Sequence, residues 1–212
     1  MSAHMLQEPC TDFLEKLASA APTPGGGGAS ALAGAVASAL VAMVGNLTVG
    51  KKKYAAVEAQ IIPMIKKADS LRLRLEHLVD ADAHAFATFM QAYKLPHTTE
   101  VETAARKAAI AAAARDAAAV PLQIADICFE ILKLAQEIAA LGNTSLITDA
   151  VVAALLARAA VRSAGYNVKI NLPLLADKQF KAQVAAHLEQ LQEQSLALEE
   201  EVIAVTDNII GK

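Results

Sequence analysis

Asp82 is the residue of this sequence whose position most clearly indicates chemistry. It falls on the apolar stripe of a predicted helix, one turn after Leu78 and one turn before Phe86. Its carboxylate should therefore point into the protein or into an interface. A buried carboxylate needs a partner, because burial raises its pKa until it becomes neutral. Spacing alone leaves two interpretations open: a core aspartate paired with an Arg or Lys of another helix, or an acid/base at a binding site.

Other titratable groups lie close to Asp82 in the sequence but on another face of the predicted helix. Asp80 stands three residues after His77 and four before His84. Such a trio can bind a metal, but a solvated polar face accounts for it more simply. No Cys/His spacing typical of a metal site occurs, and the loops suggest no Ser-His-Asp or Cys-His set. We expect no metal and no cofactor, so acid/base chemistry by side chains remains.

A run of glycines precedes the predicted helix that follows residue 28. Its members are Gly25, Gly26, Gly27 and Gly28. Free N–H groups and the dipole at a helix N-terminus favour an anion, and glycines let a ligand approach the backbone. The run lacks the Lys-Ser/Thr of a P-loop and the preceding strand of a dinucleotide-binding fold. A tight turn and a ligand-binding loop are both consistent with it.

Cationic, amide and carboxylate side chains occur at other predicted helix ends and loops. The candidates for substrate binding are Lys51, Lys52, Asn143, Asp149, Asn167 and Asn171. The two lysines come at the predicted end of a helix, where they either offset its dipole or bind carboxylates. Helix capping explains some of the others, since Asp149 is placed to cap the helix after Gly142. Such groups also suit a flat heterocycle with donor and acceptor edges.

Helices are the elements that must position these groups. Apolar residues make up 55% of the 212 residues, aromatics only 4%, and small aliphatic side chains favour closely packed helices. No stretch alternates as a strand would. The expected helices cover residues 11–19, 29–50, 54–93 with a break or kink at Pro63, 99–120, 121–141, 147–164 and 177 onward. We predict an all-α, single-domain bundle of about six to seven helices over residues 1–212, with residues 1–5 resembling an expression remnant.

Composition argues against several classes of partner and location. A net charge of −3 provides no basic field for nucleic acid. The two cysteines, Cys10 and Cys128, form no disulfide framework and are interpreted as reduced thiols of a cytoplasmic protein. Residues 29–49 are long enough to span a bilayer, but they are mostly Ala and contain polar interruptions. We interpret this segment as a buried core helix and expect no membrane partner.

Two features favour a homodimer, because one bundle does not easily cover all of the apolar sequence. The first is a small-residue face formed by Ala29, Ala33 and Ala37. The second is heptad-like spacing in the last predicted helix, which runs from Val184 to Ile209.

Several segments, in this order, resemble the formiminotransferase-cyclodeaminase and methenyltetrahydrofolate cyclohydrolase family. They are residues 22–28 (PTPGGGG), 46–54 (NLTVGKKKY), 82–86 (DAHAF) with 95–96 (LP), 120–122 (VPL), 142–143 (GN), 148–150 (TDA) and 167–171 (NVKIN). The resemblance covers nearly the whole chain. It implies an all-helical homodimer, a folate cleft bordered by the glycines near the dimer interface, and Asp82 as the catalytic carboxylate.

The resemblance implies one of two reactions on a folate substrate. The first is hydrolysis of 5,10-methenyltetrahydrofolate to 10-formyltetrahydrofolate, in which Asp82 would act as base and then as acid. The alternative is cyclisation of formiminotetrahydrofolate with release of ammonia. A third hypothesis is non-enzymatic, with the apolar helices serving only as an assembly module.

Overall fold

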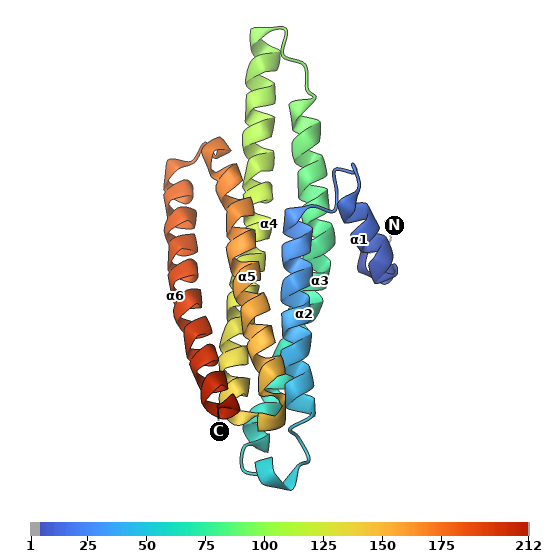
Figure 1. The fold of residues 1–212 in the computed structure, drawn as a ribbon. Helices are drawn as coiled ribbons and strands as arrows, with labels where there is room; N and C mark the ends of the chain where they lie inside the picture. Colours follow the sequence, from blue (N-terminus) through green and yellow to red (C-terminus); the bar gives the residue numbers. More distant parts are fainter. Residues whose placement is uncertain (1–4, 212) are drawn as a thin grey trace.

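The computed structural model describes residues 5–211, and in that range it contains six α-helices and no strand (Figure 1). The α-helices are α1 (Cys10–Ala18), α2 (Gly26–Asn46), α3 (Glu58–Tyr93), α4 (Glu100–Leu141), α5 (Ile147–Asn171) and α6 (Lys178–Ile210). Short 3-10 helices are η1 (Met5–Gln7), η2 (Lys52–Tyr54), η3 (Thr144–Leu146) and η4 (Leu172–Leu174). The predicted all-α class is confirmed. Residues 1–4, most of the segment interpreted as an expression remnant, lie outside the described residues.

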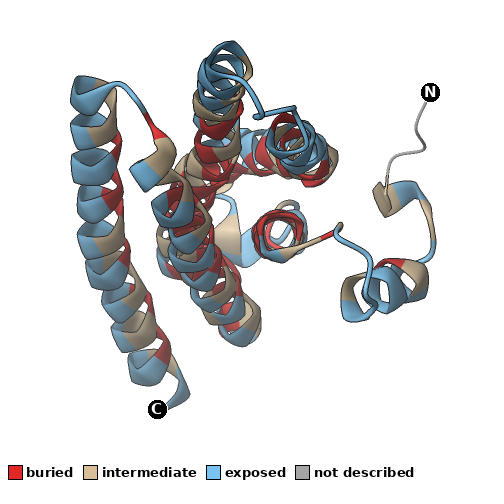
Figure 2. Cartoon of the chain, turned by 90° about the horizontal axis from the view of Figure 1, so that it is seen from above, coloured by how far each residue is buried: buried red, intermediate tan, exposed pale blue. Residues whose placement is uncertain are grey.

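The long helices form an elongated bundle with α2 and α5 side by side along its middle (Figure 1). α2 packs against α3, α4 and α5, and α6 covers α4 and α5 on the other side. The ends of α3 and α4 extend beyond the other helices as a protruding pair. Viewed from above, the buried residues gather where α2, α3, α4 and α5 face one another (Figure 2). The core is built mainly from Ala, Val, Leu and Ile, as the composition predicts.

Glycines inside α2 allow its neighbours to approach closely. A Cβ added to Gly34 would lie 2.4 Å from the Cys128 sulfur of α4, and one added to Gly45 would lie 2.5 Å from Ile65 of α3. The polar Ser38 is accommodated because its hydroxyl donates to the Ala68 carbonyl of α3 at 2.7 Å. α2 is thus the core helix that the sequence predicts.

Two helical segments are long and apolar enough to cross a membrane, judged by length and composition alone: Gly26–Asn46 and Thr144–Leu174. The bundle buries 61% of the apolar window in the first and 39% in the second. Burial among neighbouring helices accounts for most of the apolar character of α2, whereas the second segment leaves more of its apolar surface exposed.

Several predicted helix boundaries are wrong. α4 continues through Pro121, although two helices were expected to meet there. A proline costs a helix one hydrogen bond and about 3 kcal/mol, and the packing of the buried Pro121 and its neighbours outweighs that loss. α5 continues past Gly165 to Asn171, since Gly165 is the point where α6 comes close: an added Cβ would lie 2.6 Å from Gln192. α3 begins at Glu58 and passes through Pro63.

The two ends of α4 are satisfied in different ways. Thr99 and Glu102 form a capping box at its start. Gly142 follows its last residue with an extended backbone, at a φ of −76° and a ψ of −178°. Its N–H still donates to the Ile138 carbonyl at 2.8 Å, so the helix end is satisfied without a positive φ.

Candidate active site

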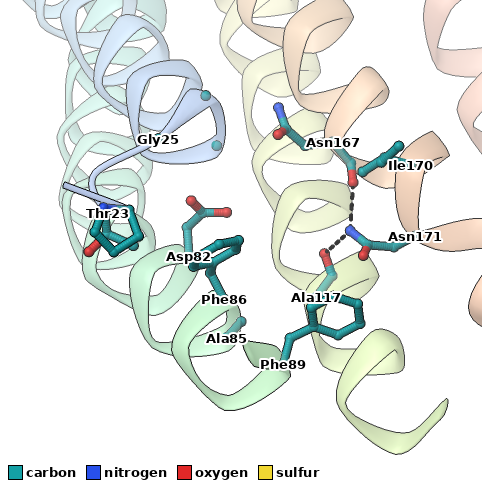
Figure 3. Close-up of a pocket in the computed structure, with 13 residues that line it drawn as sticks. Thr23, Gly25, Asp82, Ala85, Phe86, Phe89, Ala117, Asn167, Ile170 and Asn171 are labelled. Carbon is teal, nitrogen blue, oxygen red and sulfur yellow. Dashed lines mark hydrogen bonds between the residues drawn. The ribbon is translucent and has the colours of Figure 1, made fainter. Parts of the chain in front are cut away.

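A cavity of about 280 Å³ opens at the N-terminal end of α2, between α2, α3, α4 and α5 (Figure 3). Its lining residues are Pro22, Thr23, Gly25, Gly26, Gly27, Asp82, Ala85, Phe86, Phe89, Ala117, Asn167, Ile170 and Asn171. Six of the residues predicted from the sequence therefore meet at one place, although they come from three separate segments of the chain.

The carboxylate of Asp82 points from α3 towards the start of α2 (Figure 3). The backbone N–H of Gly28 donates to Asp82 Oδ2 at 3.1 Å. Burial raises the pKa of Asp82 above its ordinary value, and the Gly28 hydrogen bond opposes part of that rise. Among residues 5–211, no Lys or Arg forms an ion pair with Asp82. The interpretation as a core aspartate paired with a cation is therefore wrong.

The glycines have different roles from those expected of a loop. Gly26, Gly27 and Gly28 form the first turn of α2 rather than a loop before it, and Gly25 is the N-cap. A Cβ added to Gly27 would lie 2.1 Å from Asp82 Oδ1 and 2.6 Å from Oδ2, whereas an added Cβ at Gly28 makes only ordinary contacts at 3.6 Å. The anion predicted at this helix N-terminus is thus the Asp82 carboxylate itself, which the dipole of α2 favours.

Two asparagines from the last turns of α5 form the wall opposite Asp82. Asn171 Nδ2 donates to the carbonyls of Ala117 at 3.0 Å and Asn167 at 2.9 Å (Figure 3). Asn167 Nδ2 donates to the Ser163 carbonyl at 3.0 Å. These bonds hold both amides in fixed orientations. The prediction placed the asparagines in a loop, but the helix presents them one turn apart on one face.

Apolar side chains complete the cavity. Phe86 and Phe89 follow Asp82 along α3 on its apolar stripe, yet Phe86 remains 38% exposed and lines the cavity instead of the core. Ile170, which is 73% exposed, and Ala117 were missed by the sequence analysis. The signal for Ile170 was its position three residues after Asn167, on the same helical face.

Four of the predicted binding residues lie at the opposite end of the bundle. Lys51 and Lys52 follow the C-terminus of α2, and Asn143 and Asp149 precede or begin α5 (Figure 1). The 21 residues of α2 separate this end from Asp82, a distance of roughly 30 Å at 1.5 Å per residue. Within one chain, the structure therefore does not place these four residues in the cavity. The sequence analysis missed this because the order of motifs along a chain does not reveal which end of a bundle each motif reaches.

Asn143 has a structural role at the end of the bundle opposite Asp82. Its N–H donates to Thr48 Oγ1 at 2.9 Å, its side-chain amide donates to the Leu47 carbonyl at 3.3 Å, and its Oδ1 accepts from the Ser145 N–H at 3.2 Å. With 7% of its surface exposed, Asn143 joins the end of α2 to the start of η3. Asp149 lies in the first turn of α5, where the helix dipole stabilises a negative charge.

His77, Asp80 and His84, the trio considered as a metal site, lie on α3 outside the cavity. The Met5 N–H donates to Asp80 Oδ1 at 3.0 Å, which ties the N-terminal segment to α3, and His84 is exposed. Within residues 5–211, no group of three or more His, Cys, Asp or Glu side chains is arranged to hold a metal ion.

Comparison with known proteins identifies relatives along most of the chain. The sequence profile of the formiminotransferase-cyclodeaminase family matches residues 9–190. A methenyltetrahydrofolate cyclohydrolase from Methylorubrum extorquens is 46% identical over 190 residues, which cover 90% of this chain and 91% of that protein. A formimidoyltransferase-cyclodeaminase from Sus scrofa is 35% identical over 187 residues, but the match covers only 35% of that longer protein.

A solved structure shares the whole fold. Formiminotetrahydrofolate cyclodeaminase from Thermotoga maritima superposes with a TM-score of 0.87 at 30% identity, covering 97% of this chain and 98% of that one. The match to the family profile covers both the start of α2 and Asp82. This chain belongs to the formiminotransferase-cyclodeaminase family.

Proposed function

We propose that this protein is a methenyltetrahydrofolate cyclohydrolase that converts 5,10-methenyltetrahydrofolate to 10-formyltetrahydrofolate with Asp82 as its acid/base. The observation that carries the proposal is the Asp82 carboxylate, which lines a cavity of about 280 Å³ with an N–H donor but no cationic partner among the described residues. The similarity along almost the full length of the Methylorubrum extorquens cyclohydrolase supports hydrolysis as the reaction.

The charge of the substrate suits this carboxylate. The methenyl carbon of the substrate belongs to an amidinium cation that bridges two nitrogens, N5 and N10. A cation beside a partly buried carboxylate favours its ionised form and lowers its pKa. Substrate binding would therefore counteract the rise in the pKa of Asp82 that burial causes. In this way the substrate supplies the positive charge that the protein does not place beside Asp82.

The reaction then needs one proton acceptor that later becomes a donor. Water adds to the methenyl carbon while Asp82 accepts one of its protons, which forms a neutral carbinolamine. Collapse of the carbinolamine breaks the bond between this carbon and N5, forms the formyl carbonyl on N10 and releases the hydroxyl proton. Asp82 returns its proton to N5, so that the net reaction consumes one water and releases one proton. General acid/base catalysis of this kind contributes about 10²- to 10⁴-fold.

The remaining walls of the cavity suit a flat ring system. Phe86 and Phe89 provide apolar surface on one side, and the fixed amides of Asn167 and Asn171 provide polar edges on the other. Pockets that enclose a whole drug-sized ligand usually have volumes of about 300–1,000 Å³. A cavity of about 280 Å³ therefore suits the fused rings, with the aminobenzoyl-glutamate tail outside it.

One experiment separates the candidate functions. The purified protein is given methenyltetrahydrofolate, whose absorbance is followed, and in parallel formiminotetrahydrofolate, from which ammonia release is measured. Loss of methenyl absorbance above the spontaneous rate supports the cyclohydrolase. Ammonia release without hydrolysis supports the cyclodeaminase, the activity named for the Thermotoga maritima relative. If neither reaction occurs and folate titration shows no saturable binding, the non-enzymatic assembly hypothesis holds.

The role of Asp82 is tested by a matched pair of variants. Asp82→Asn keeps the shape of the side chain but removes the base, so turnover should fall about a hundredfold or more while the helical circular dichroism spectrum is retained. Asp80→Asn removes the same charge two residues away on α3, where the side chain accepts a hydrogen bond from Met5 outside the cavity. Asp80→Asn should cost little activity. Near-normal turnover of Asp82→Asn contradicts the mechanism.

The same proposal includes a cytoplasmic homodimer that needs no cofactor, nucleic acid or membrane. Its structural support differs from what the sequence suggested. The stripe of α6 packs inside the bundle, since Val184, Leu188 and Val202 are buried, and Ala37 of α2 is also buried. The apolar surface available for a partner lies instead on the exposed faces of α2 and α5.

A further inference from the structure

The side-chain amides of Asn167 and Asn171 are held so that their oxygens are left over for a ligand. An asparagine amide offers one acceptor, Oδ1, and two donor hydrogens on Nδ2. In Asn171 both hydrogens are used, because Nδ2 donates to the backbone carbonyls of Ala117 and Asn167 (Figure 3). In Asn167, Nδ2 donates to the Ser163 carbonyl. Turning either amide over would set two acceptors against each other, so the packing around α5 fixes which atom stays free.

Neither amide oxygen has a hydrogen-bond partner in the protein. Within residues 5–211, no hydrogen bond engages Oδ1 of Asn167 or Oδ1 of Asn171. Among the same residues, the one buried side-chain nitrogen or oxygen without a partner is Arg158 Nε, so neither amide oxygen is buried and unpaired. Both oxygens are therefore accessible, in residues that line the cavity. Asn167 Oδ1 would lie 3.5 Å from a Cβ added to Gly26, which also lines the cavity.

The wall across the cavity is also an acceptor. Asp82 Oδ2 accepts from the Gly28 N–H at 3.1 Å, while no hydrogen bond within the described residues engages Oδ1. The polar side chains that line the cavity are Thr23, Asp82, Asn167 and Asn171, and three of these four present oxygen lone pairs. A ligand that fills the cavity must therefore bring hydrogen-bond donors on two sides, because an acceptor left unpaired costs affinity.

We propose that Asn167 and Asn171 are specificity-determining residues, which accept hydrogen bonds from the donor edge of the pyrimidine ring of the substrate. The proposal rests on the proposed function for the identity of that substrate. The 2-amino-4-oxopyrimidine ring of a folate carries hydrogens on N3 and on the 2-amino group, which stand side by side on one edge. The two amide oxygens come from successive turns on one face of α5, so they can meet the same edge of a flat ring.

This assignment also sets the direction in which the substrate lies. The donor edge of the pyrimidine ring and the methenyl carbon are at opposite ends of the fused rings. Asn167 and Asn171 form the wall opposite Asp82, so a donor edge at α5 leaves the methenyl carbon on the side of Asp82 (Figure 3). In the reversed orientation, the Asp82 carboxylate would bind N3 and the 2-amino group, and the reacting carbon would lie against α5, away from the proposed base.

The fixed amides make the selection strict. Because both hydrogens of Asn171 Nδ2 are already bonded, this amide cannot rotate to offer a donor without breaking two hydrogen bonds. A ring with an acceptor or a methyl group at this edge leaves an amide oxygen unpaired in the cavity. A site built to hydrogen-bond a polar group rejects an analogue that lacks it, because the group of the site is then left unpaired. We expect a preference of about ten- to hundredfold for the donor edge.

Ligand titration tests the proposal without turnover. The two probes are 5,8-dideazafolate, which keeps N3–H and the 2-amino group, and its 2-desamino-2-methyl analogue, in which a methyl group replaces the amino group. Neither probe contains the methenyl bridge, so neither is hydrolysed. Isothermal titration calorimetry of the wild-type protein should show that the methyl analogue binds about ten- to hundredfold more weakly than dideazafolate. Equal affinities overturn the proposal.

Variants of the two asparagines locate the preference. Asn171→Leu keeps about the size of the side chain but lacks the oxygen. It should bind dideazafolate about tenfold more weakly, and the methyl analogue about as well as the wild type does. Asn167→Leu should show the same pattern, which keeps the test available if one variant does not fold. Asn208→Leu, at an exposed position of α6, is the matched control and should keep the wild-type preference.

Asp82→Asn separates the two orientations of the ring. If the donor edge lies at α5, this variant keeps the preference for dideazafolate over the methyl analogue. Loss of the preference in Asp82→Asn, with its retention in both leucine variants of the cavity asparagines, overturns the proposal in favour of the reversed orientation. Turnover of methenyltetrahydrofolate is measured separately. A protein that hydrolyses it without distinguishing the probes contradicts only this inference, whereas absence of both hydrolysis and binding contradicts the proposed function as well.

Discussion

Replacement of Gly27 by alanine perturbs the proposed base without touching it chemically. The added Cβ would lie 2.1 Å from Oδ1, 2.4 Å from Cγ and 2.6 Å from Oδ2 of Asp82. Carbon and oxygen atoms in contact are normally more than 3 Å apart, so one of the two residues must move. Gly27 is fixed in the first turn of a buried helix, and therefore the Asp82 side chain has to rotate away from α2 and from the Gly28 N–H.

The expected effects on activity and stability differ in size. A general base contributes a rate enhancement of about 10²- to 10⁴-fold, and much of this is lost when the base is displaced. We therefore expect turnover to fall about a hundredfold. The lost hydrogen bond to a charged group costs about 1.5–3 kcal/mol, while alanine in place of helical glycine returns about 0.5–1 kcal/mol. The net loss of about 1–2 kcal/mol lowers the melting temperature by only about 2–8 °C for a chain of this size.

The assay measures hydrolysis of methenyltetrahydrofolate and thermal unfolding on the same preparations. Gly28→Ala is the matched control, because its added Cβ meets its nearest neighbours at 3.6 Å, and it should lose far less activity. Combining Gly27→Ala with Asp82→Asn gives a double-mutant cycle. If Gly27 acts through Asp82, the double variant is no slower than Asp82→Asn. Wild-type turnover in Gly27→Ala, or full additivity in the cycle, refutes this reasoning.

Two further predictions concern titration. Because burial raises the pKa of Asp82 above its ordinary 3.8, the free protein binds this proton more tightly when folded. It therefore loses stability as pH rises from about 4 through the raised pKa. Asp82→Asn should have a higher melting temperature than wild type at pH 7, and this difference should disappear below about pH 4. A difference that persists at that low pH would contradict a raised pKa of Asp82. Hydrogen bonds from Thr144, with smaller contributions from Lys53, lower the pKa of Tyr54 to about 8. Ultraviolet titration should thus show a tyrosine ionising near pH 8, and this step should be absent in Tyr54→Phe.

Asp82 was predictable from the sequence for a physical reason. A helix with a 3.6-residue period has one buried face, and a carboxylate on that face stands out without any structure. The structure confirms that Asp82 points inward from α3, where it lines a cavity, and among the described residues it shows no cation paired with it. Residues 25–28 were also predicted to belong to a site, although their role in admitting Asp82 to the start of α2 depends on a packing distance that no sequence pattern contains.

Two of the missed boundaries share one cause. Gly165 and Pro121 carry strong local signals to end a helix, yet both lie where helices of the bundle pack against one another. Gly165 leaves room for Gln192 and Leu188 of α6, with an added Cβ at 2.6 and 3.0 Å from them. Tertiary packing therefore outweighs the local preference. As a result α5 reaches Asn171, and the two asparagines that were expected in a loop become a rigid wall of the cavity.

The absence of a cation beside Asp82 in the described structure explains why this carboxylate suits a cationic substrate. An Arg or Lys at hydrogen-bond distance would lower the pKa of Asp82, make it a weaker base and repel an amidinium ion. The Gly28 N–H and the dipole of α2 instead hold the carboxylate in place without adding a full positive charge. The unpaired charge costs stability in the free protein, and binding of the substrate cation relieves that cost. The same electrostatic mismatch that weakens the empty bundle thus favours a substrate that carries a positive charge.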